Sequence, residues 1–300
     1  MNTIDISIVV PTYNSSNKII NLINSCSKIE ELTYEVILVD DFSSDIESLY
    51  RIISNNPEFK VIKNKYKANA SINRNYGISI SKGKYIFLMD SDDYFTEEYL
   101  RHRIMLMDSN SGVYYGNFLK KDSFGYHPSN IRAIECNENP VDYLFHNNQS
   151  DFRTSTISFT ADFKDSVIFD ERLFKHQDWG LLCNLSESGV NINFDNNNFV
   201  IINECSEGRM SFKSDIYASF YFYYRYCDRS TINAKKEFIK KIIRSTIIEN
   251  NYKKFNLALS IFPLSRFNRY VFILNALNKI GIINKTNFSK ISKYLNKKYE

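Results

Sequence analysis

Residues 6–41 read ISIVVPTYNSSNKIINLINSCSKIEELTYEVILVDD, and this stretch decides the fold. It contains two continuous apolar runs rich in β-branched residues, at 6–10 and 36–39. Such runs indicate strands that are buried on both faces of a parallel sheet. The isoleucines between them have helical spacing and predict a helix over 16–27, so the stretch is expected to form a strand–helix–strand unit.

The alternation of strands and helices continues along the chain. Strands are predicted over 59–62, 85–89, 113–115 and 156–159, and helices over 46–54, 71–81, 100–107 and 174–188. An aromatic-rich segment over 216–227 and basic helices to the C-terminus follow. This order predicts an α/β fold with an open, mostly parallel sheet and helices on both faces, plus a C-terminal helical region.

Polar side chains follow three of these strands, where each strand ends. Thr12-Tyr13-Asn14 follows the first strand, Asp40-Asp41 the second, and Asp90-Ser91-Asp92-Asp93 the fourth. Ligands of open α/β sheets bind outside the carboxyl ends of the strands. We therefore expect these segments to border one binding site.

The run Asp90-Ser91-Asp92-Asp93 favours a divalent cation. Three carboxylates this close repel one another unless a cation lies between them. Mg²⁺ and Mn²⁺ prefer a few carboxylates combined with phosphate oxygens, which suits a bound nucleotide diphosphate. A solvated acidic turn that caps the helix near Glu97 is the alternative, but the preceding buried strand favours the metal site.

No glycine-rich phosphate loop follows the first strand. The patterns G-x-G-x-x-G and G-x-x-x-x-G-K-[ST] are both absent there, which argues against NAD enzymes and P-loop NTPases. The phosphate charge must then be met by metal and by basic side chains. Arg74 is the candidate, and an ordinary surface arginine is the alternative.

Five motifs occur in order within residues 4–95. They are Ile8-Val9-Val10-Pro11-Thr12-Tyr13-Asn14, Val39-Asp40-Asp41-Phe42-Ser43-Ser44-Asp45, Asn73-Arg74-Asn75-Tyr76-Gly77-Ile78, Gly83-Lys84-Tyr85-Ile86-Phe87 and Met89-Asp90-Ser91-Asp92-Asp93. Together they resemble the family 2 glycosyltransferases of the GT-A fold. Enzymes of that family transfer a sugar from a nucleotide-sugar donor with inversion.

The resemblance implies roles for the donor half of the site. The residues expected to contact the nucleotide-sugar are Pro11, Thr12, Tyr13, Asn14, Asp40, Asp41, Arg74, Asp90, Ser91 and Asp93. Asp41, with Asp40 behind it, would accept a hydrogen bond from uracil, and Arg74 would approach the diphosphate. Asp90 and Asp92 would bind Mn²⁺ or Mg²⁺, with Asp92 as the direct ligand. Phe42 stands where the family commonly has glycine, so we expect a less strained turn there.

An inverting transfer also needs a base that takes the proton of the acceptor hydroxyl. In similar enzymes the base comes from an acidic pair before an aromatic residue at the start of a helix, and Gln177-Asp178-Trp179 stands in that position. Asp178 is the candidate base, with Gln177 and Trp179 on the acceptor side. A carboxylate that only stabilises the helix N-terminus is the alternative. Arg209 falls where a loop closes over the donor and is expected to reach the phosphates, or to be a surface arginine.

Charge is distributed unevenly along the 300 residues. The net charge of +4 combines −8 over residues 1–232 with +12 over 233–300, where 12 Lys and 3 Arg face 3 Glu. Basic residues over 235–244 interleave with apolar ones over 238–247, which predicts a basic amphipathic helix. Such a helix suits an anionic membrane surface. A solvated helix packed on the catalytic domain, or compositional bias alone, are the alternatives.

The five cysteines are scattered and do not form a metal or disulfide pattern, which favours buried free thiols in a reducing compartment. The N-terminus lacks the pattern of a signal peptide, and no apolar run reaches the length of a membrane span. We expect a cytoplasmic protein, at most peripheral on the inner face of the plasma membrane.

The sequence thus predicts a catalytic domain over 1–215, with a donor half at 1–95 and an acceptor half at 96–215, and a basic helical region at 216–300. The expected reaction is inverting transfer from a UDP-hexose or UDP-N-acetylhexosamine to a saccharide, expected to be linked to polyprenyl diphosphate, in bacterial surface polysaccharide synthesis (O-antigen, capsule or lipooligosaccharide). The alternatives are a nucleotidyltransferase and a non-catalytic nucleic-acid-binding protein. Neither a basic glycine-rich loop nor a nucleic-acid-binding motif supports them, and no nucleic-acid partner is expected.

Overall fold

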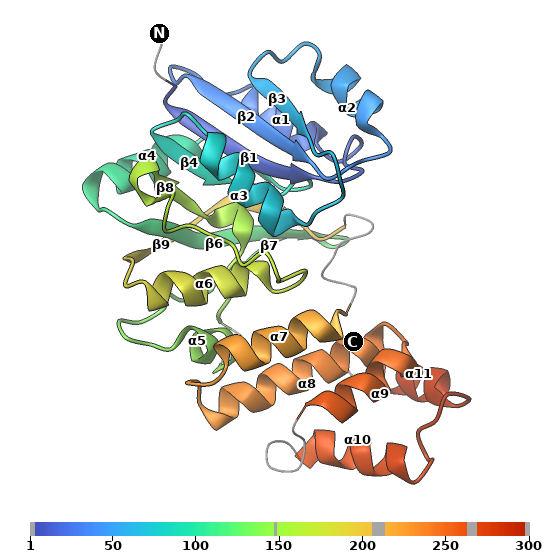
Figure 1. The fold of residues 1–300 in the computed structure, drawn as a ribbon. Helices are drawn as coiled ribbons and strands as arrows, with labels where there is room; N and C mark the ends of the chain where they lie inside the picture. The colour runs from blue at the N-terminus through green and yellow to red at the C-terminus, as the bar shows by residue number, and fades with distance from the viewer. Residues whose placement is uncertain (1–3, 147–148, 206–213, 263–268, 298–300) are drawn as a thin grey trace. The chain divides into compact units, whose positions relative to one another are not determined.

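The computed structural model describes residues 4–146, 149–205, 214–262 and 269–297. The chain forms two compact units (Figure 1). One consists of residues 1–136 and 149–206, and the other of residues 137–148 and 207–300. The predicted division at residue 215 stays a prediction; in the structure, the internal segment 137–148 packs with the C-terminal helices.

The first unit is built on one sheet with the strand order β3-β2-β1-β4-β8-β6-β9-β5, with β7 paired to β6. The strands are β1 (Ile6–Thr12), β2 (Tyr34–Asp40), β3 (Phe59–Lys63), β4 (Tyr85–Leu88), β5 (Tyr94–Phe95), β6 (Val113–Asp122), β7 (Gly125–Pro128), β8 (Ser158–Thr160) and β9 (Ile192–Asn203). The first four strands are parallel to one another. Beyond β4 the sheet mixes antiparallel pairs with the parallel pair β6–β9. The α/β fold is confirmed, but the sheet is mixed rather than mostly parallel, and its purely parallel part is formed by the first 90 residues.

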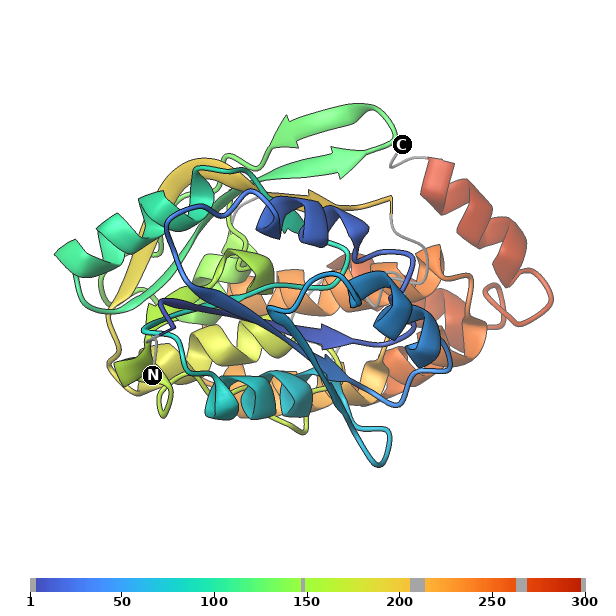
Figure 2. The same cartoon turned by 90° about the horizontal axis from the view of Figure 1, so that it is seen from above.

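Helices cover both faces of this sheet. They are α1 (Ile20–Cys26), α2 (Ile46–Ile53), α3 (Ala70–Ile80), α4 (Tyr99–Ser109) and α6 (Gln177–Glu187), with short 3₁₀ turns η1 (Thr154–Thr156) and η2 (Ala161–Phe163). Figure 2 shows α1 and α3 on opposite faces of the parallel strands. Helix α3 lies close to β1 because Gly77 has no side chain; a Cβ there would come within 2.4 Å of Val9 Cγ1.

The register of the parallel strands brings their carboxyl ends together. Thr12 is paired with Asp40, and Val9 with Leu88, one residue before Met89 and two before Asp90. The aliphatic residues of β1, β2 and β4 are buried, apart from the half-buried Pro11, whereas the edge strand β3 is partly exposed. The polar segments that follow β1, β2 and β4 therefore begin at one edge of the sheet, as the sequence predicts.

Several boundaries after residue 96 differ from the prediction, and the strand expected over 113–115 continues to Asp122. The expected strand 156–159 starts later, because Thr154–Thr156 forms a 3₁₀ turn before β8. The expected helix 174–188 begins at Gln177, because His176 takes the left-handed conformation with φ 64° and cannot extend a right-handed helix.

The second unit is helical, with α5 (Pro140–His146), α7 (Ile216–Tyr226), α8 (Ile232–Ile248), α9 (Tyr252–Ile261), α10 (Arg269–Lys279) and α11 (Phe288–Lys297). Its core contains an aromatic cluster in which Phe238 of α8 contacts Phe222, Tyr223 and Phe262. Among the helices of the described ranges, none is long and apolar enough to span a bilayer.

The apolar side of α8 is not available to a membrane. Its residues Phe238, Ile239, Ile242, Ile243 and Ile247 are at most 3% exposed. They are buried where α8 packs against α5, α9 and α11. This helix therefore packs its apolar side within the helical unit, and contact of its basic side with an anionic membrane stays a prediction.

The cysteines are free, as expected, but they are not all buried. Cys26, Cys183 and Cys227 are buried, whereas Cys136 and Cys205 are exposed.

Candidate active site

Asp40 and Asp41 follow β2 and lie beside the end of β1. Asp40 is fully buried and accepts hydrogen bonds from Thr12 Oγ1 at 3.5 Å and from the Ser43 backbone N–H at 3.0 Å. Asp41 accepts a bond from the Ala68 N–H through Oδ1 at 2.6 Å. Its Oδ2 has no hydrogen bond from the described residues, so Asp41 keeps an acceptor for a ligand while Asp40 shapes the turn.

The turn after β2 is strained, contrary to the expectation from Phe42. Phe42 has φ 62° and Asn14 has φ 48°, both in the left-handed region. Asparagine tolerates this region, but a bulky aromatic residue there is uncommon and indicates local strain. The side chain of Asn14 ties the two turns together, because its Oδ1 accepts bonds from the Ser44 N–H at 2.9 Å and the Ser44 hydroxyl at 3.1 Å. The replacement of glycine by phenylalanine therefore keeps the glycine-like backbone.

Tyr13 is half exposed at the same edge, with Lys67 Nζ 3.6 Å from the centre of its ring. Pro11 and Thr12 end strand β1, and Thr12 is buried. The residues predicted for the nucleoside pocket thus lie together at the ends of β1 and β2. An aromatic ring with a cation beside it can present a stacking surface to a base.

The turn after β4 is held by Ser155 of η1. Its hydroxyl accepts a hydrogen bond from the Asp90 N–H at 3.0 Å and donates to Asp93 Oδ2 at 2.6 Å. Asp93 Oδ1 accepts from the Asn203 N–H at 2.9 Å. Both oxygens of Asp93 are therefore engaged, and Asp93 supports the turn from within the protein. Ser91 bonds Ser15 Oγ at 2.9 Å, which joins this turn to the β1 edge.

The pKa of Asp93 is affected by the neighbouring carboxylates. Burial, followed by the charges of Asp92 and Asp90, raises the pKa of Asp93 to about 8. Unlike Asp93, both Asp90 and Asp92 are partly exposed. A cation beside the two outer carboxylates would relieve this repulsion.

Arg74 connects the turn to helix α6. Its Nη2 donates to Asp90 Oδ1 at 2.6 Å, and its Nη1 donates to Gln177 Oε1 at 2.7 Å. Gln177 in turn donates through Nε2 to the Leu173 carbonyl at 2.9 Å. The guanidinium is buried and lies over the ring of Phe169. Arg74 is thus an internal bridge between Asp90 and the start of α6, and both ends of the Gln177 amide are occupied.

Asp178 lies in the first turn of α6 and is partly buried. Burial raises its pKa to about 6, while the charges of Arg153 and Arg74 and the bond from the Trp179 N–H oppose the rise. The charge of Asp151 adds to the rise. Burial therefore outweighs the helix N-terminus and the nearby arginines, and the carboxylate has the proton affinity of a general base near neutral pH.

Trp179 stacks on His176, with ring centres 4.5 Å apart and planes tilted by 13°. His176 covers one face of the indole ring, and it also forms the left-handed N-cap of α6. Any sugar that stacks on Trp179 must use the rest of its surface. His176 thus fixes both the start of α6 and the orientation of Trp179.

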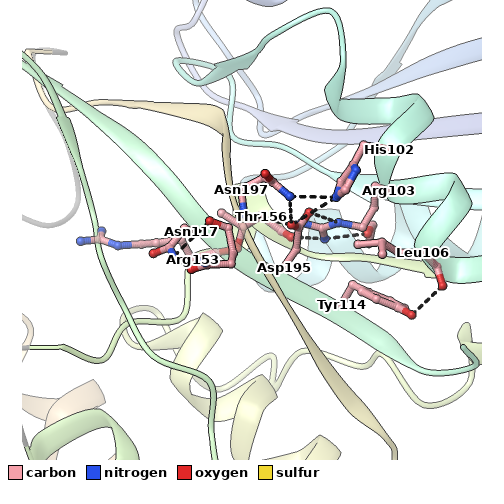
Figure 3. Close-up of polar contacts among 11 residues, drawn as sticks. His102, Arg103, Leu106, Tyr114, Asn117, Arg153, Thr156, Asp195 and Asn197 are labelled. Carbon is pink, nitrogen blue, oxygen red and sulfur yellow. Dashed lines mark hydrogen bonds and ion pairs between the residues drawn. The ribbon is translucent and has the colours of Figure 1, made fainter.

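The 3₁₀ turn η1 is anchored by a buried ion pair (Figure 3). Arg103 of α4 pairs with Asp195 of β9 at 3.1 Å and donates to the Thr156 carbonyl at 2.9 Å. Arg153, at the other end of η1, donates to Asp151 Oδ2 at 2.7 Å. The turn η1 therefore positions Ser155 to bond Asp90 and Asp93, and it places Arg153 close enough to Asp178 to affect its pKa. Sequence patterns gave no signal for these residues, because they follow no strand or helix periodicity.

The predicted donors for a cation are Asp90 and Asp92. Asp90 keeps a second oxygen beyond the one that binds Arg74, and its side chain is 39% exposed. No cluster of three or more His, Cys, Asp or Glu side chains suited to a metal occurs in the described ranges. Two carboxylates without a closed cage fit a Mg²⁺ or Mn²⁺ that takes its other ligands from a diphosphate and water. Arg209 lies outside the described residues.

The sequence comparisons identify one family. The model of "Glycosyl transferase family 2" matches residues 7–163, more than half of the chain. The amylovoran biosynthesis glycosyltransferase AmsB of Erwinia amylovora is 27% identical over 63% of this chain and 66% of its own length. An Escherichia coli protein, UDP-Glc:alpha-D-GlcNAc-diphosphoundecaprenol beta-1,3-glucosyltransferase WfgD, is 30% identical over 38% of this chain and 45% of its own length. The matches thus span less than two thirds of these relatives.

The fold is also found in solved structures. The crystal structure of S. aureus TarS 1–349 in complex with UDP-GlcNAc superposes with a TM-score of 0.61 at 18% identity. The superposition covers 90% of this chain and 84% of that one. The architecture of the sheet and its helices is therefore shared with that protein.

Proposed function

The chain belongs to glycosyl transferase family 2, and from this premise we propose that it transfers a sugar from a UDP-sugar to a saccharide hydroxyl with inversion. One observation carries the proposal. Arg74 joins Asp90 of the turn after β4 to Gln177, the neighbour of Asp178. One side chain thus binds the carboxylate proposed for the donor side and the residue beside Asp178, whose raised pKa suits the acceptor side.

In the proposed reaction, the acceptor hydroxyl attacks the anomeric carbon as the bond from that carbon to the diphosphate breaks. Asp178 takes the hydroxyl proton, and UDP leaves with the bonding electron pair. Attack on the face opposite the diphosphate inverts the anomeric centre. A pKa of about 6 keeps Asp178 mostly ionised at neutral pH yet basic enough to accept a proton.

The donor side would be assembled at the edge of the sheet. Asp41 would accept from the uracil ring through the oxygen that the described residues leave unbonded, and Tyr13 would border the base. Asp92, with Asp90, would hold Mn²⁺ or Mg²⁺. When bound there, such an ion supplies positive charge to the diphosphate as it leaves. Arg74 keeps Asp90 oriented and adds positive charge on the protein side.

The names of the related proteins support a role in polysaccharide synthesis. AmsB is named for amylovoran biosynthesis, and the name of WfgD specifies a donor of UDP-Glc and an acceptor on diphosphoundecaprenol. The TarS structure holds UDP-GlcNAc. We therefore propose UDP-hexose or UDP-N-acetylhexosamine as donor, a saccharide linked to polyprenyl diphosphate as acceptor, and action at the inner face of the bacterial plasma membrane.

A nucleotide-sugar panel tests this function. UDP-glucose, UDP-N-acetylglucosamine, GDP-mannose and TDP-glucose are each incubated with the protein, with Mn²⁺ or with EDTA, and the release of nucleotide is measured. We expect release from a UDP-sugar, loss of release in EDTA, and loss in Asp92→Ala. Release from a GDP- or TDP-sugar alone would overturn the donor class. Equal release in EDTA and in Asp92→Ala would overturn the metal site.

A further inference from the structure

Helix α10 carries an apolar stripe that the described residues leave uncovered. Phe272 is 54% exposed, Ile273 46%, Ile280 69% and Ile282 53%, the last two in the turn that follows the helix. Exposed residues this large are uncommon when they are contiguous. The stripe is therefore expected to contact another molecule or a membrane.

Three of the four stripe residues lie on one side of the helix, whose hydrogen-bond pattern continues to Ile280 through a bond from its N–H to the Ala276 carbonyl. At about 3.6 residues per turn, positions 272, 273, 276 and 280 fall within one third of the circumference. The other side carries Val271 and Leu274, which are buried where α10 packs on α8 and α9 (Figure 1). The core of the unit thus already uses one side of α10, and the stripe is a second apolar side.

Positive charge surrounds the stripe. Residues 250–299 contain ten Lys or Arg and not one Asp or Glu. Arg269 and Lys279 are exposed at the two ends of α10, on or beside the side that bears the stripe. The turn that carries Ile280 and Ile282 continues to Lys285, which lines a hollow of about 610 Å³ together with Lys253, Asn256 and Ser289.

We propose that α10 and the following turn form the surface by which this protein lies on an anionic lipid bilayer. The apolar stripe would enter the boundary between headgroups and acyl chains, while Arg269, Lys279 and Lys285 meet lipid phosphates. An interfacial helix with apolar residues on one side and basic residues at its borders has this composition. The inference deepens the proposed function, on which it rests, because an acceptor linked to polyprenyl diphosphate lies in such a membrane.

Two other occupants fit the stripe less well. Nucleic acid would match the positive charge. However, the four exposed apolar side chains carry neither a charge nor a hydrogen-bond donor that could bind a phosphate. A second copy of the chain would bring the like charges of Arg269 and Lys279 to the same contact. A bilayer with anionic headgroups satisfies both the apolar and the basic residues.

Vesicle co-sedimentation of the full chain tests the proposal. The vesicles are phosphatidylcholine alone or with about 30% phosphatidylglycerol, in salt of about 0.1 M. The stripe variant is Phe272→Ser with Ile280→Ser, and the charge variant is Lys279→Glu with Lys285→Glu. The matched control is Ile232→Ser with Ile248→Ser, which changes two equally exposed apolar residues of α8. Unfolding temperatures confirm that each variant is folded.

We expect wild type and the control to sediment with anionic vesicles and not with neutral ones. Both test variants should bind the anionic vesicles at least about tenfold more weakly than wild type. Absence of sedimentation by the wild type, or sedimentation of the stripe variant like wild type, would overturn the proposal. A wild-type dimer that dissociates in the stripe variant would also overturn the proposal. So would binding of DNA by wild type that the stripe variant loses. Nucleotide release from a soluble donor needs no membrane. If the stripe variant releases nucleotide like wild type, its loss of vesicle binding concerns this surface and not the proposed transferase activity.

Discussion

The side chain of Arg74 donates to Asp90 Oδ1 at 2.6 Å from a buried position on α3. The same guanidinium reaches Gln177 at 2.7 Å, so it spans the distance between the turn after β4 and the start of α6. A planar guanidinium has two donor ends in fixed geometry, whereas an ammonium group is a single point charge. The arrangement of the two carboxylate-bearing segments therefore depends on an arginine at this position.

Arg74→Lys is expected to lower kcat/KM about 100-fold. Lysine keeps the charge but cannot hold Asp90 and Gln177 at once, and a misplaced carboxylate costs a large part of the rate. Steady-state assays of UDP release check this. Arg51→Lys, at an exposed arginine of α2, is the control and should stay within about twofold of wild type. Activity of Arg74→Lys equal to that of the control would contradict the bridging role.

The rate should depend on the ionisation of Asp178. Because its pKa is about 6 and the base must be ionised, kcat/KM should rise with pH up to about 6 and then level off. Arg153 lowers the pKa of Asp178 and Asp151 raises it. Arg153→Met should therefore move the acid limb to higher pH, and Asp151→Asn should move it to lower pH.

The two variants provide a control for each other. Both break the 2.7 Å ion pair between Arg153 and Asp151, so an effect of the broken pair alone would move the limb in the same direction. Profiles from pH 5 to 8 in each variant give the comparison. Shifts of equal sign, or a limb that stays in place, would show that Asp178 does not set the profile.

Asp93 should make the fold less stable as pH rises. Its pKa is about 8 in the folded protein and near 4 in an unfolded chain, so folding takes up a proton between these values. Stability contributed by the protonated form is present at low pH and is lost as pH rises from about 4 to about 8. Asp93→Asn should remove this loss and exceed wild type by at least about 1 kcal/mol at pH 8.

Urea unfolding in EDTA at pH 5 and pH 8 measures this difference. Asp162→Asn, at an exposed carboxylate of η2, serves as the control and should follow wild type at both pH values. Parallel pH dependence in wild type and Asp93→Asn would rule out Asp93 as the group responsible. Added Mn²⁺ should reduce the difference, since a cation near Asp90 and Asp92 offsets the repulsion.

The first 95 residues could be predicted closely because their signals are local. Strands β1, β2 and β4 each contain a continuous apolar run, and each is followed by the polar residues that border the site. Strand β9 was not predicted. Its centre, Asp195 to Asn198, interrupts the apolar pattern, and a register shift opposite Gly116 and Phe118 accommodates it.

The supporting residues of the site depend on tertiary contacts. Ser155 and Asn203 are separated from Asp93 by 62 and 110 positions, so no local pattern links them. The left-handed His176 shows the same limit, because a helical period cannot reveal a single residue with positive φ. The sequence could suggest Arg74 as a phosphate-binding residue but not its two partners inside the protein.

Asp178→Asn tests the central claim most directly. The variant keeps the size of the side chain but removes the base, so UDP affinity measured by calorimetry should stay within about twofold of wild type. UDP release from UDP-glucose or UDP-N-acetylglucosamine, with water or GlcNAc-diphosphoundecaprenol as acceptor, should fall about 1,000-fold. Release within about tenfold of wild type, with UDP binding intact, would contradict the assignment of Asp178 as the base.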